Sequence, residues 1–326
     1  MPVNKLFQSD QFDPTLNLAV EEALLLRADA VPALFLWQNA HTVVIGRGQN
    51  AWKECRSDLL KEEGGILVRR STGGGAVYHD LGNLNFSFVM PKGIYDVSRQ
   101  LRVIQRAVHS FGVETQVSGR NDIVIKESGA KFSGNAFRHM PDSSLHHGTI
   151  LYHVDMQKLG RYLMPSEEKL RAKGVESVRS PVENLAPRAP GMDIASLKAA
   201  LFEAFAEEYG PSEHVAWQEV LPTKQIEELQ EKYRSWDWTF GRTPEFDISL
   251  RHRFQWGEAE LLLSMRHGKV HRADCYTDAN DPELAGRISS LLQGAPFSPS
   301  ALASALKISG RPEDDDIAAW LAEQIL

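Results

Sequence analysis

The chain has 326 residues, of which 42% are hydrophobic and 24% charged, a composition typical of an ordinary globular protein. This length is sufficient for one large domain and a smaller one, and no apolar run approaches the roughly 18 residues of a membrane-spanning helix. The net charge of −7 argues against an extended nucleic-acid interface, which needs a basic face. We therefore expect no nucleic-acid or membrane partner. Because the N-terminus lacks a secretory signal pattern, we expect a cytoplasmic location.

The N-terminal part of the sequence predicts one helix followed by short strands. An Asp-Pro pair before apolar residues at helical spacing predicts a helix over 14–28. The β-rich runs 33–37 and 42–46 are separated by Gln-Asn-Ala-His, so they predict two strands paired with each other. A short helix ending at Gly64 follows. Further extended runs lie at 66–70, 76–79, 84–90, 121–126, 131–138 and 145–155.

The remaining helices and strands define the fold class. Asp96 and Asp193 are typical N-caps of amphipathic helices that end at Gly112 and Gly210. Because the strands mostly follow one another directly, the sequence favours an α+β fold whose large domain has a mixed, mainly antiparallel sheet flanked by helices.

The C-terminal part predicts a small α+β domain. Turn residues at 235–246 favour a domain boundary, so we predict domains over 1–245 and 246–326. The runs 253–256, 259–265 and 269–277 predict an antiparallel meander, and helices are expected at 282–293, 299–307 and 314–326.

The most informative stretch is RRSTGGGAVYHD, which begins at Arg69 and places Gly73, Gly74 and Gly75 between two predicted strands. Three glycines in a row contribute nothing to a core, so they indicate either a turn or a ligand close to the main chain. Backbone N–H groups in such a loop can hold phosphate oxygens, and the arginines would add charge. A hairpin with solvated arginines is the alternative. The strand-loop-strand context fits neither the P-loop nor the dinucleotide-binding fingerprint.

Several motifs in order together resemble the lipoate-protein ligase A family of the biotin/lipoate ligase superfamily. Besides the glycine loop, they are NLAVEE (17–22), VVIGRGQN (43–50), SGRNDIVI (118–125), KFSGNAFR (131–138), HHGTILYHVD (146–155), KGVESVRS (173–180) and WDWTFGRTPEF (236–246). The resemblance covers essentially the whole chain.

This resemblance implies a two-step reaction. ATP, with Mg²⁺, and lipoate first give lipoyl-AMP and pyrophosphate. The lipoyl group then passes to a lysine ε-amine on apo lipoyl domains of 2-oxoacid dehydrogenase E2 subunits and on the glycine cleavage H protein. Octanoate is an expected alternative acid. The metal ligands are not assigned.

The resemblance also implies the site residues. Lys131 contacts both the carboxyl/phosphoryl junction and the nucleotide, and KGVESVRS corresponds to a loop that closes over the adenylate. The nucleotide-binding residues are Arg70, Gly75, Ala76, Val77 and Tyr78, together with Lys131. The lipoate slot is assigned to Ser71, Thr72, Gly73, Gly74, Gly75 and Lys131, with His79, Asn83 and Asp122 as further candidates.

The chemistry of these residues suits the reaction. When a carboxylate attacks the α-phosphorus, two anions meet, and nearby positive charge stabilises the transition state. Lys131 and Arg70 can supply that charge, and Asp122 could orient Lys131 or help hold Mg²⁺. A solvated hairpin lysine is the alternative for Lys131. His79, His146 and His147 could include a general base, or could simply satisfy backbone groups at strand ends.

Three rival functions remain open. Biotin-protein ligases share the chemistry, but their loop usually reads GRGRxGR before a tryptophan, unlike the loop of this chain. Octanoyl- and lipoyl-transferases of the superfamily use an acyl-cysteine, and neither Cys55 nor Cys275 lies in a motif that we would place at the acyl carbon. A protein that binds an acyl-nucleotide without turnover is the third alternative.

Overall fold

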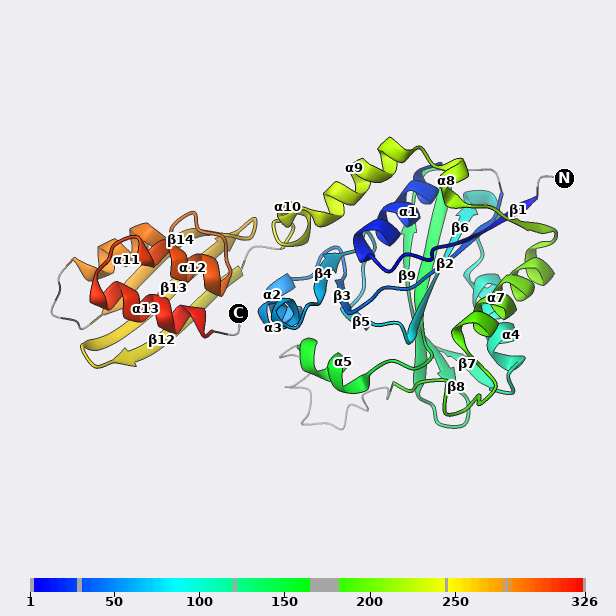
Figure 1. Cartoon of the computed structure of the whole chain (residues 1–326), viewed down its shortest axis with the longest axis horizontal. Helices are drawn as coiled ribbons and strands as arrows, with labels where there is room; N and C mark the ends of the chain where they lie inside the picture. Colours follow the sequence, from blue (N-terminus) through cyan, green and yellow to red (C-terminus); the bar gives the residue numbers. More distant parts are fainter. Residues whose placement is uncertain are drawn as a thin grey trace. The chain divides into compact units, whose positions relative to one another are not determined.

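The structure, a computed structural model (Figure 1), describes residues 3–27, 31–119, 122–164, 182–243, 246–277, 279, 281 and 283–324. The chain divides into a large unit, residues 1–47 and 64–234, and a small unit, residues 48–63 and 235–326. The segment 48–63 thus belongs to the small unit although it interrupts the large one along the sequence. The predicted domain boundary between residues 245 and 246 stays a prediction.

The large unit is built on an eight-stranded sheet with the order β11-β1-β2-β6-β10-β9-β8-β7. Strand β1 is parallel to both β11 and β2, and each of the other neighbouring pairs is antiparallel. The predicted α+β class with a mixed, mainly antiparallel sheet is therefore confirmed. The strands are β1 (Asn4–Gln8), β2 (Ala33–Trp37), β6 (Asn83–Pro91), β7 (Thr115–Ser118), β8 (Asp122–Ile125), β9 (Lys131–His139), β10 (Ser143–Leu151) and β11 (Ser212–His214).

A second, three-stranded sheet in the large unit has the order β4-β3-β5. Its strands are β3 (Thr42–Ile45), β4 (Ile66–Arg69) and β5 (Val77–His79). The predicted pairing of 33–37 with 42–46 is wrong, because β2 pairs with β1 and β6, whereas β3 pairs with β4 and β5. His41, with a φ of 22°, lies in the short connection and turns the chain from one sheet into the other.

Helices cover both sides of the large sheet. Figure 1 shows α4 (Val97–His109) and α7 (Ile194–Tyr209) on one side, and α1 (Pro14–Arg27) with the three-stranded sheet on the other. The predicted caps are present: Asp96 accepts from the backbone of α4, and Asp193 forms a capping box with Ser196. The shorter helices of this unit are α5 (Met156–Tyr162), α8 (Trp217–Val220) and α9 (Thr223–Arg234), with the 3₁₀ turn η1 (Lys92–Ile94).

Strand β6 is buried on both faces, with an apolar core on one face and buried polar side chains on the other. Leu84, Phe86 and Phe88 belong to the apolar core that the sheet shares with α4 and α7. The alternate residues Asn83, Asn85 and Ser87 are polar and point to the opposite face, where Ser87 bonds to Trp37 of β2 and to Glu21 of α1. This second face is buried as well, so the large unit encloses polar side chains between its two sheets.

The small unit combines a meander with three helices. Strands β12 (Phe246–Phe254), β13 (Gly257–Arg266) and β14 (Lys269–Thr277) are antiparallel, and alternate residues of β13 are buried against a helical layer. That layer is α11 (Leu284–Leu292), α12 (Pro299–Lys307) and α13 (Pro312–Ala322), as predicted. The unit also contains α2 (Ala51–Glu54), α3 (Ser57–Glu62) and α10 (Trp236–Thr239), and Trp52 of α2 joins its core.

A buried ion pair ties α11 to α13 in the small unit. The Arg287 guanidinium donates to both carboxylate oxygens of the fully buried Asp314, at 2.8 and 2.9 Å. We expect Asp314→Ala to lower the free energy of unfolding of the small unit by about 3 kcal/mol, because Arg287 would keep a buried charge with fewer partners. Hydrogen exchange in α11 and α13 measures this loss.

The matched control is Asp274→Ala, which removes an exposed ion pair with Arg272 and should change the same free energy by less than about 1 kcal/mol. Equal effects of the two substitutions would contradict the structural role assigned to Asp314.

Candidate functional site

A cavity of about 370 Å³ lies between the two sheets of the large unit. The eight-stranded sheet contributes its floor, and the three-stranded sheet with the glycine loop contributes the opposite wall. Its lining residues are Leu18, Trp37, Val44, Arg70, Gly74, Gly75, Ala76, Val77, His79, Asn85, Asp122, Lys131, Gly134, Asn135, Ala136, His147, Gly148 and Thr149. The glycine loop and Lys131 therefore share one cavity.

The floor is a row of residues from five neighbouring strands. Trp37 is opposite Asn85, Asn85 is opposite Thr149, and Gly134 is opposite Asp122. The row is continuous, because the Gly134 N–H approaches Thr149 Oγ1 at 3.4 Å. Opposite residues of antiparallel strands project to the same face, and four strand spacings correspond to about 19 Å. The cavity is thus long, with Trp37 at one end and Asp122 at the other.

The two ends differ in exposure. At the Trp37 end, which we call the closed end, Leu18, Trp37, Asn85 and His79 are between 0% and 3% exposed. At the other, open end, the side chains of Lys131 and Asp122 are 30% and 32% exposed, and Gly74 and Gly75 are on the surface. Burying an ionic group in an apolar end is strongly unfavourable, so a polyanionic ligand fits the open end and a neutral group the closed end.

Lys131 has a defined position at the open end. It begins β9, and its Nζ is 2.7 Å from Asp122 Oδ1 on the neighbouring strand β8. A Cβ atom at Gly134 would lie 2.9 Å from this Nζ, so the absence of a side chain at residue 134 makes room for the lysine. Asp122 therefore pairs with Lys131, and both roles that the sequence suggested for Asp122 stay predictions.

Arg70 holds the glycine loop from inside. Its Nη2 donates to the carbonyls of Gly73 and Gly75 at 2.6 and 2.8 Å, and its Nη1 donates to the Val44 carbonyl of β3 at 3.2 Å. Its Nε donates to Thr72 Oγ1 at 3.0 Å. Burial lowers the pKa of Arg70 to about 10, which leaves the guanidinium charged at neutral pH. Arg70 thus fixes the loop and keeps a positive charge beneath it.

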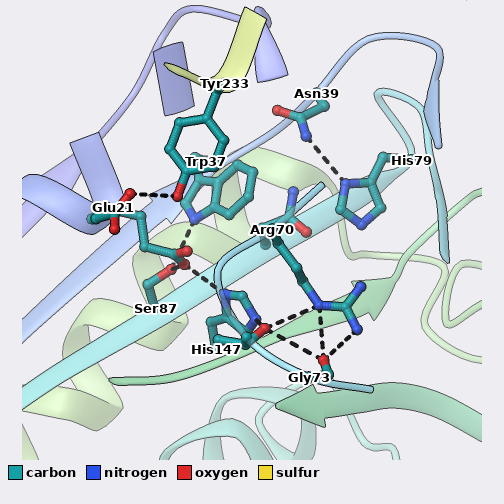
Figure 2. Close-up of polar contacts among 12 residues, drawn as sticks. Glu21, Trp37, Asn39, Arg70, Gly73, His79, Ser87, His147 and Tyr233 are labelled. Carbon is teal, nitrogen blue, oxygen red and sulfur yellow. Dashed lines mark hydrogen bonds and ion pairs between the residues drawn. The ribbon is translucent and has the colours of Figure 1, made fainter. Parts of the chain in front are cut away.

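A chain of buried hydrogen bonds continues from the loop to the closed end (Figure 2). Thr72 Oγ1 is 2.8 Å from His147 Nε2, and His147 Nδ1 is 2.7 Å from Glu21 Oε1. Glu21 accepts from the Ser87 hydroxyl, which in turn accepts from Trp37 Nε1 at 2.9 Å. The chain joins the glycine loop, β10, α1 and β2 around the cavity.

The other two histidines of interest differ in position. His146 lies on the core face between two side-chain amides, with Nδ1 at 2.7 Å from the Gln100 amide and Nε2 at 2.8 Å from the Asn135 amide. His79 lines the cavity, and its Nδ1 contacts Asn39 Nδ2 at 3.2 Å. Burial lowers the pKa of each histidine to about 3, so both are neutral at physiological pH.

Not every residue assigned to the site from the resemblance lines the cavity. Arg70, Gly74, Gly75, Ala76, Val77, His79, Asp122 and Lys131 do. Ser71, Thr72, Gly73, Tyr78 and Asn83 do not. Thr72 and Gly73 contact Arg70, whereas Tyr78 packs on Tyr162 with ring centroids 5.6 Å apart. Asn83 donates to Asn85 at 3.0 Å. The motif KGVESVRS lies outside the described residues, and the functional roles of all these residues stay predictions.

Sequence reasoning missed Trp37, Asn85 and Thr149, which line the cavity floor, and Glu21, which bonds to the cavity-lining His147. One signal was available in NLNFSF at 83–88, where polar and apolar residues alternate in a strand that is buried on both faces. A buried polar face needs partners, so this alternation indicates a polar interior beside the strand.

Both thiols belong to the small unit, whereas the cavity belongs to the large one. Cys55 and Cys275 are buried, neither lines the cavity, and burial raises the pKa of the two thiols to about 12 and about 11. Within the part of the chain that the structure describes, no helix is both long enough and apolar enough to cross a membrane.

Comparisons with known proteins identify the family of this chain. The family model for the lipoyl protein ligase A/B catalytic domain matches residues 13–206, and the model for the bacterial lipoate protein ligase C-terminus matches residues 243–321. The chain therefore belongs to the family of the lipoyl protein ligase A/B catalytic domain. The resemblance to lipoate-protein ligase A that its sequence motifs indicated is confirmed.

Three solved structures are similar over their whole length. LipL1 of P. falciparum, in complex with lipoate, is 28% identical, with a TM-score of 0.64, covering 98% of this chain and 100% of that one. A bi-partite lipoate protein ligase of Thermoplasma acidophilum, described together with its E2 lipoyl domain, is 27% identical, with a TM-score of 0.63 and coverages of 76% and 100%. A lipoate-protein ligase A bound with ATP is 25% identical, with a TM-score of 0.62 and coverages of 74% and 100%.

The buried histidines predict an acid-sensitive large unit. Because the folded pKa values of His79 and His146 lie near 3, below the ordinary 6.5, the unfolded chain binds more protons between these values. Their contribution to stability is fully present above pH 6.5 and is lost as the pH falls toward 3, by up to about 1.4 kcal/mol per pH unit for each histidine. Urea unfolding of the large unit between pH 7 and 5 measures the slope.

His146→Gln should reduce that slope, and substitution of the exposed His153 by Gln is the control. An unchanged slope in a folded His146→Gln protein would contradict the assignment of a neutral buried imidazole.

Proposed function

We propose that this chain is an ATP-dependent lipoate-protein ligase. In the first step a lipoate carboxylate oxygen attacks the α-phosphorus of ATP, the bond to the β-phosphate oxygen breaks, and pyrophosphate leaves. In the second step a lysine ε-amine attacks the acyl carbon of lipoyl-AMP, an amide forms, and AMP and a proton are released. Family membership and the continuous cavity between the glycine loop, Lys131 and Trp37 support this proposal.

The orientation of the ligands follows from charge and burial. We place the triphosphate at the open end, beside Lys131, Gly74 and Gly75, because solvent and the lysine can compensate its charges there. The acyl chain then extends toward the buried Trp37. The carboxylate and the α-phosphate meet near the Lys131 ammonium, which stabilises charge on both reactants in the transition state. Arg70 supports the loop and adds positive charge from beneath it.

The residues of the cavity fit a Mg²⁺ ion that binds together with the nucleotide phosphates. Asp122 is the one carboxylate among the described residues that line the cavity, and the described residues contain no cluster of three or more His, Cys, Asp or Glu suited to a metal. Mg²⁺ commonly takes one or two carboxylates together with phosphate oxygens. We propose that Asp122 and the phosphates share the ion, which would neutralise phosphate charge.

The proposed acceptors are E2 lipoyl domains and the glycine cleavage H protein. The archaeal ligase that this chain resembles is described with an E2 lipoyl domain, which supports E2 lipoyl domains as acceptors. The glycine cleavage H protein and the use of octanoate rest on the sequence resemblance. A cytoplasmic location also stays a prediction.

Lys131→Ala should lower pyrophosphate release from ATP and lipoate by about 100-fold or more, because it removes the charge that both anionic reactants share. Lys126→Ala, an exposed lysine on the adjoining turn, is the matched control and should retain the wild-type rate. Wild-type pyrophosphate release by Lys131→Ala would refute the role of this residue.

The same assay separates the rival functions. With an apo lipoyl domain added, a ligase gives an ATP-dependent mass increase of the acceptor, and Cys55→Ser should retain it because Cys55 is buried outside the cavity. Lipoylation without ATP that Cys55→Ser abolishes would favour the transferase. Ligand binding without turnover would favour the non-catalytic protein.

A further inference from the structure

Buried amides determine the tautomer of His79. Asn17 Nδ2 donates to two backbone carbonyls, those of Gln11 and Gln38, at 2.9 and 2.8 Å, so this atom is a nitrogen. The same nitrogen lies 3.1 Å from Asn39 Oδ1, and because both of its hydrogens are directed at the two carbonyls, an oxygen fits at this contact better than a second NH₂ group. The other end of Asn39, its Nδ2, donates to His79 Nδ1 at 3.2 Å (Figure 2). Since Nδ1 accepts, the proton of the neutral ring is on Nε2.

This Nε2–H is a buried donor without a protein partner among the described residues. His79 is 3% exposed, lines the cavity and packs edge-on against Trp37 at 6.4 Å between ring centroids. Asn85, on the floor beside Trp37, likewise leaves its Nδ2 without a partner, because its Oδ1 accepts from Asn83. An unsatisfied buried donor is costly, so two of them at the closed end indicate a ligand that carries acceptor atoms there.

The proposed function says which ligand atoms reach the closed end. With the carboxylate at Lys131, the far end of the acid lies beside Trp37, His79 and Asn85. Lipoate and octanoate share their carboxylate and an eight-carbon chain, and they differ at this far end, where lipoate carries two ring sulfurs. A divalent sulfur is polarisable and a weak hydrogen-bond acceptor, whereas a hydrocarbon end accepts nothing.

We propose that the Nε2–H of His79, supported by the Asn85 amide, donates to a ring sulfur of lipoate and makes the closed end select a dithiolane over a plain alkyl end. The inference rests on the proposed function and adds specificity-determining residues to it. Octanoate would fill the same space but leave the donor unpaired, and discrimination of this kind arises when a site presents a buried polar group to an analogue that lacks its partner.

The direct test compares lipoate and octanoate in ATP-pyrophosphate exchange by the full chain. His79→Phe keeps a ring and removes both nitrogens, and we expect the ratio of kcat/KM for lipoate to that for octanoate to fall about 3- to 10-fold, mainly through the KM of lipoate. His79→Gln, whose amide nitrogen can replace Nε2–H, should recover much of the ratio. A folded His79→Phe protein with an unchanged ratio overturns the inference.

Two further measurements test the position of the His79 proton: NMR of the wild type and the Asn39→Asp variant. Nitrogen-15 NMR of labelled histidine should find the His79 proton on Nε2 in the wild type, and a proton on Nδ1 overturns the inference whether or not the variants fold. Asn39→Asp, which replaces the donor to Nδ1 by an acceptor, should move the proton to Nδ1 and lower the lipoate preference. If the wild type activates neither acid, the proposed function itself fails; if it activates both and the ratio does not respond to His79→Phe, only this inference fails.

Discussion

The site depends on the buried guanidinium of Arg70. It gathers the carbonyls of Gly73 and Gly75 and joins them to the Val44 carbonyl of β3, so one side chain attaches the glycine loop to the three-stranded sheet. Gly74, with a φ of 92°, gives the loop the left-handed turn that this arrangement needs. The guanidinium stays charged at neutral pH and adds positive charge beneath the loop, although the carbonyls that accept from it compensate part of that charge. Thr72 then links the loop to His147 and Glu21, and so to the closed end.

The two ends of the cavity differ in burial, and they therefore suit different parts of a ligand. Charged groups stand at the open end, where Lys131 and Asp122 are partly solvated, and the neutral polar groups His79 and Asn85 stand at the closed end beside Trp37. This division follows from the cost of burying charge, and it gives a substrate with one anionic and one uncharged end a single favourable direction. The inferred tautomer of His79 adds a second donor, beside the Asn85 amide, to this buried end.

The sequence predicted those parts of the structure that local patterns determine. Helical spacing and N-caps identified α1, α4 and α7, and turn residues with alternating apolar residues identified the meander of the small unit. The pairing of β2 with β3 could not be excluded locally, because the turn at His41 sends β3 into another sheet through contacts distant along the chain. For the same reason, Lys131 and the glycine loop were found by their motifs, whereas Trp37, Asn85 and Glu21 were not. Their place in the site arises from strand register across the sheet and from the packing of α1.

The most direct test of the central claim is a crystal structure of the protein with a non-hydrolysable analogue of lipoyl-AMP. The phosphate should lie beside the Lys131 ammonium and the glycine loop at the open end, with the dithiolane ring beside Trp37 and His79. An analogue bound in the opposite direction, with adenine at Trp37, or bound outside this cavity, would contradict the claim that one cavity joins a solvated nucleotide to a buried acyl chain.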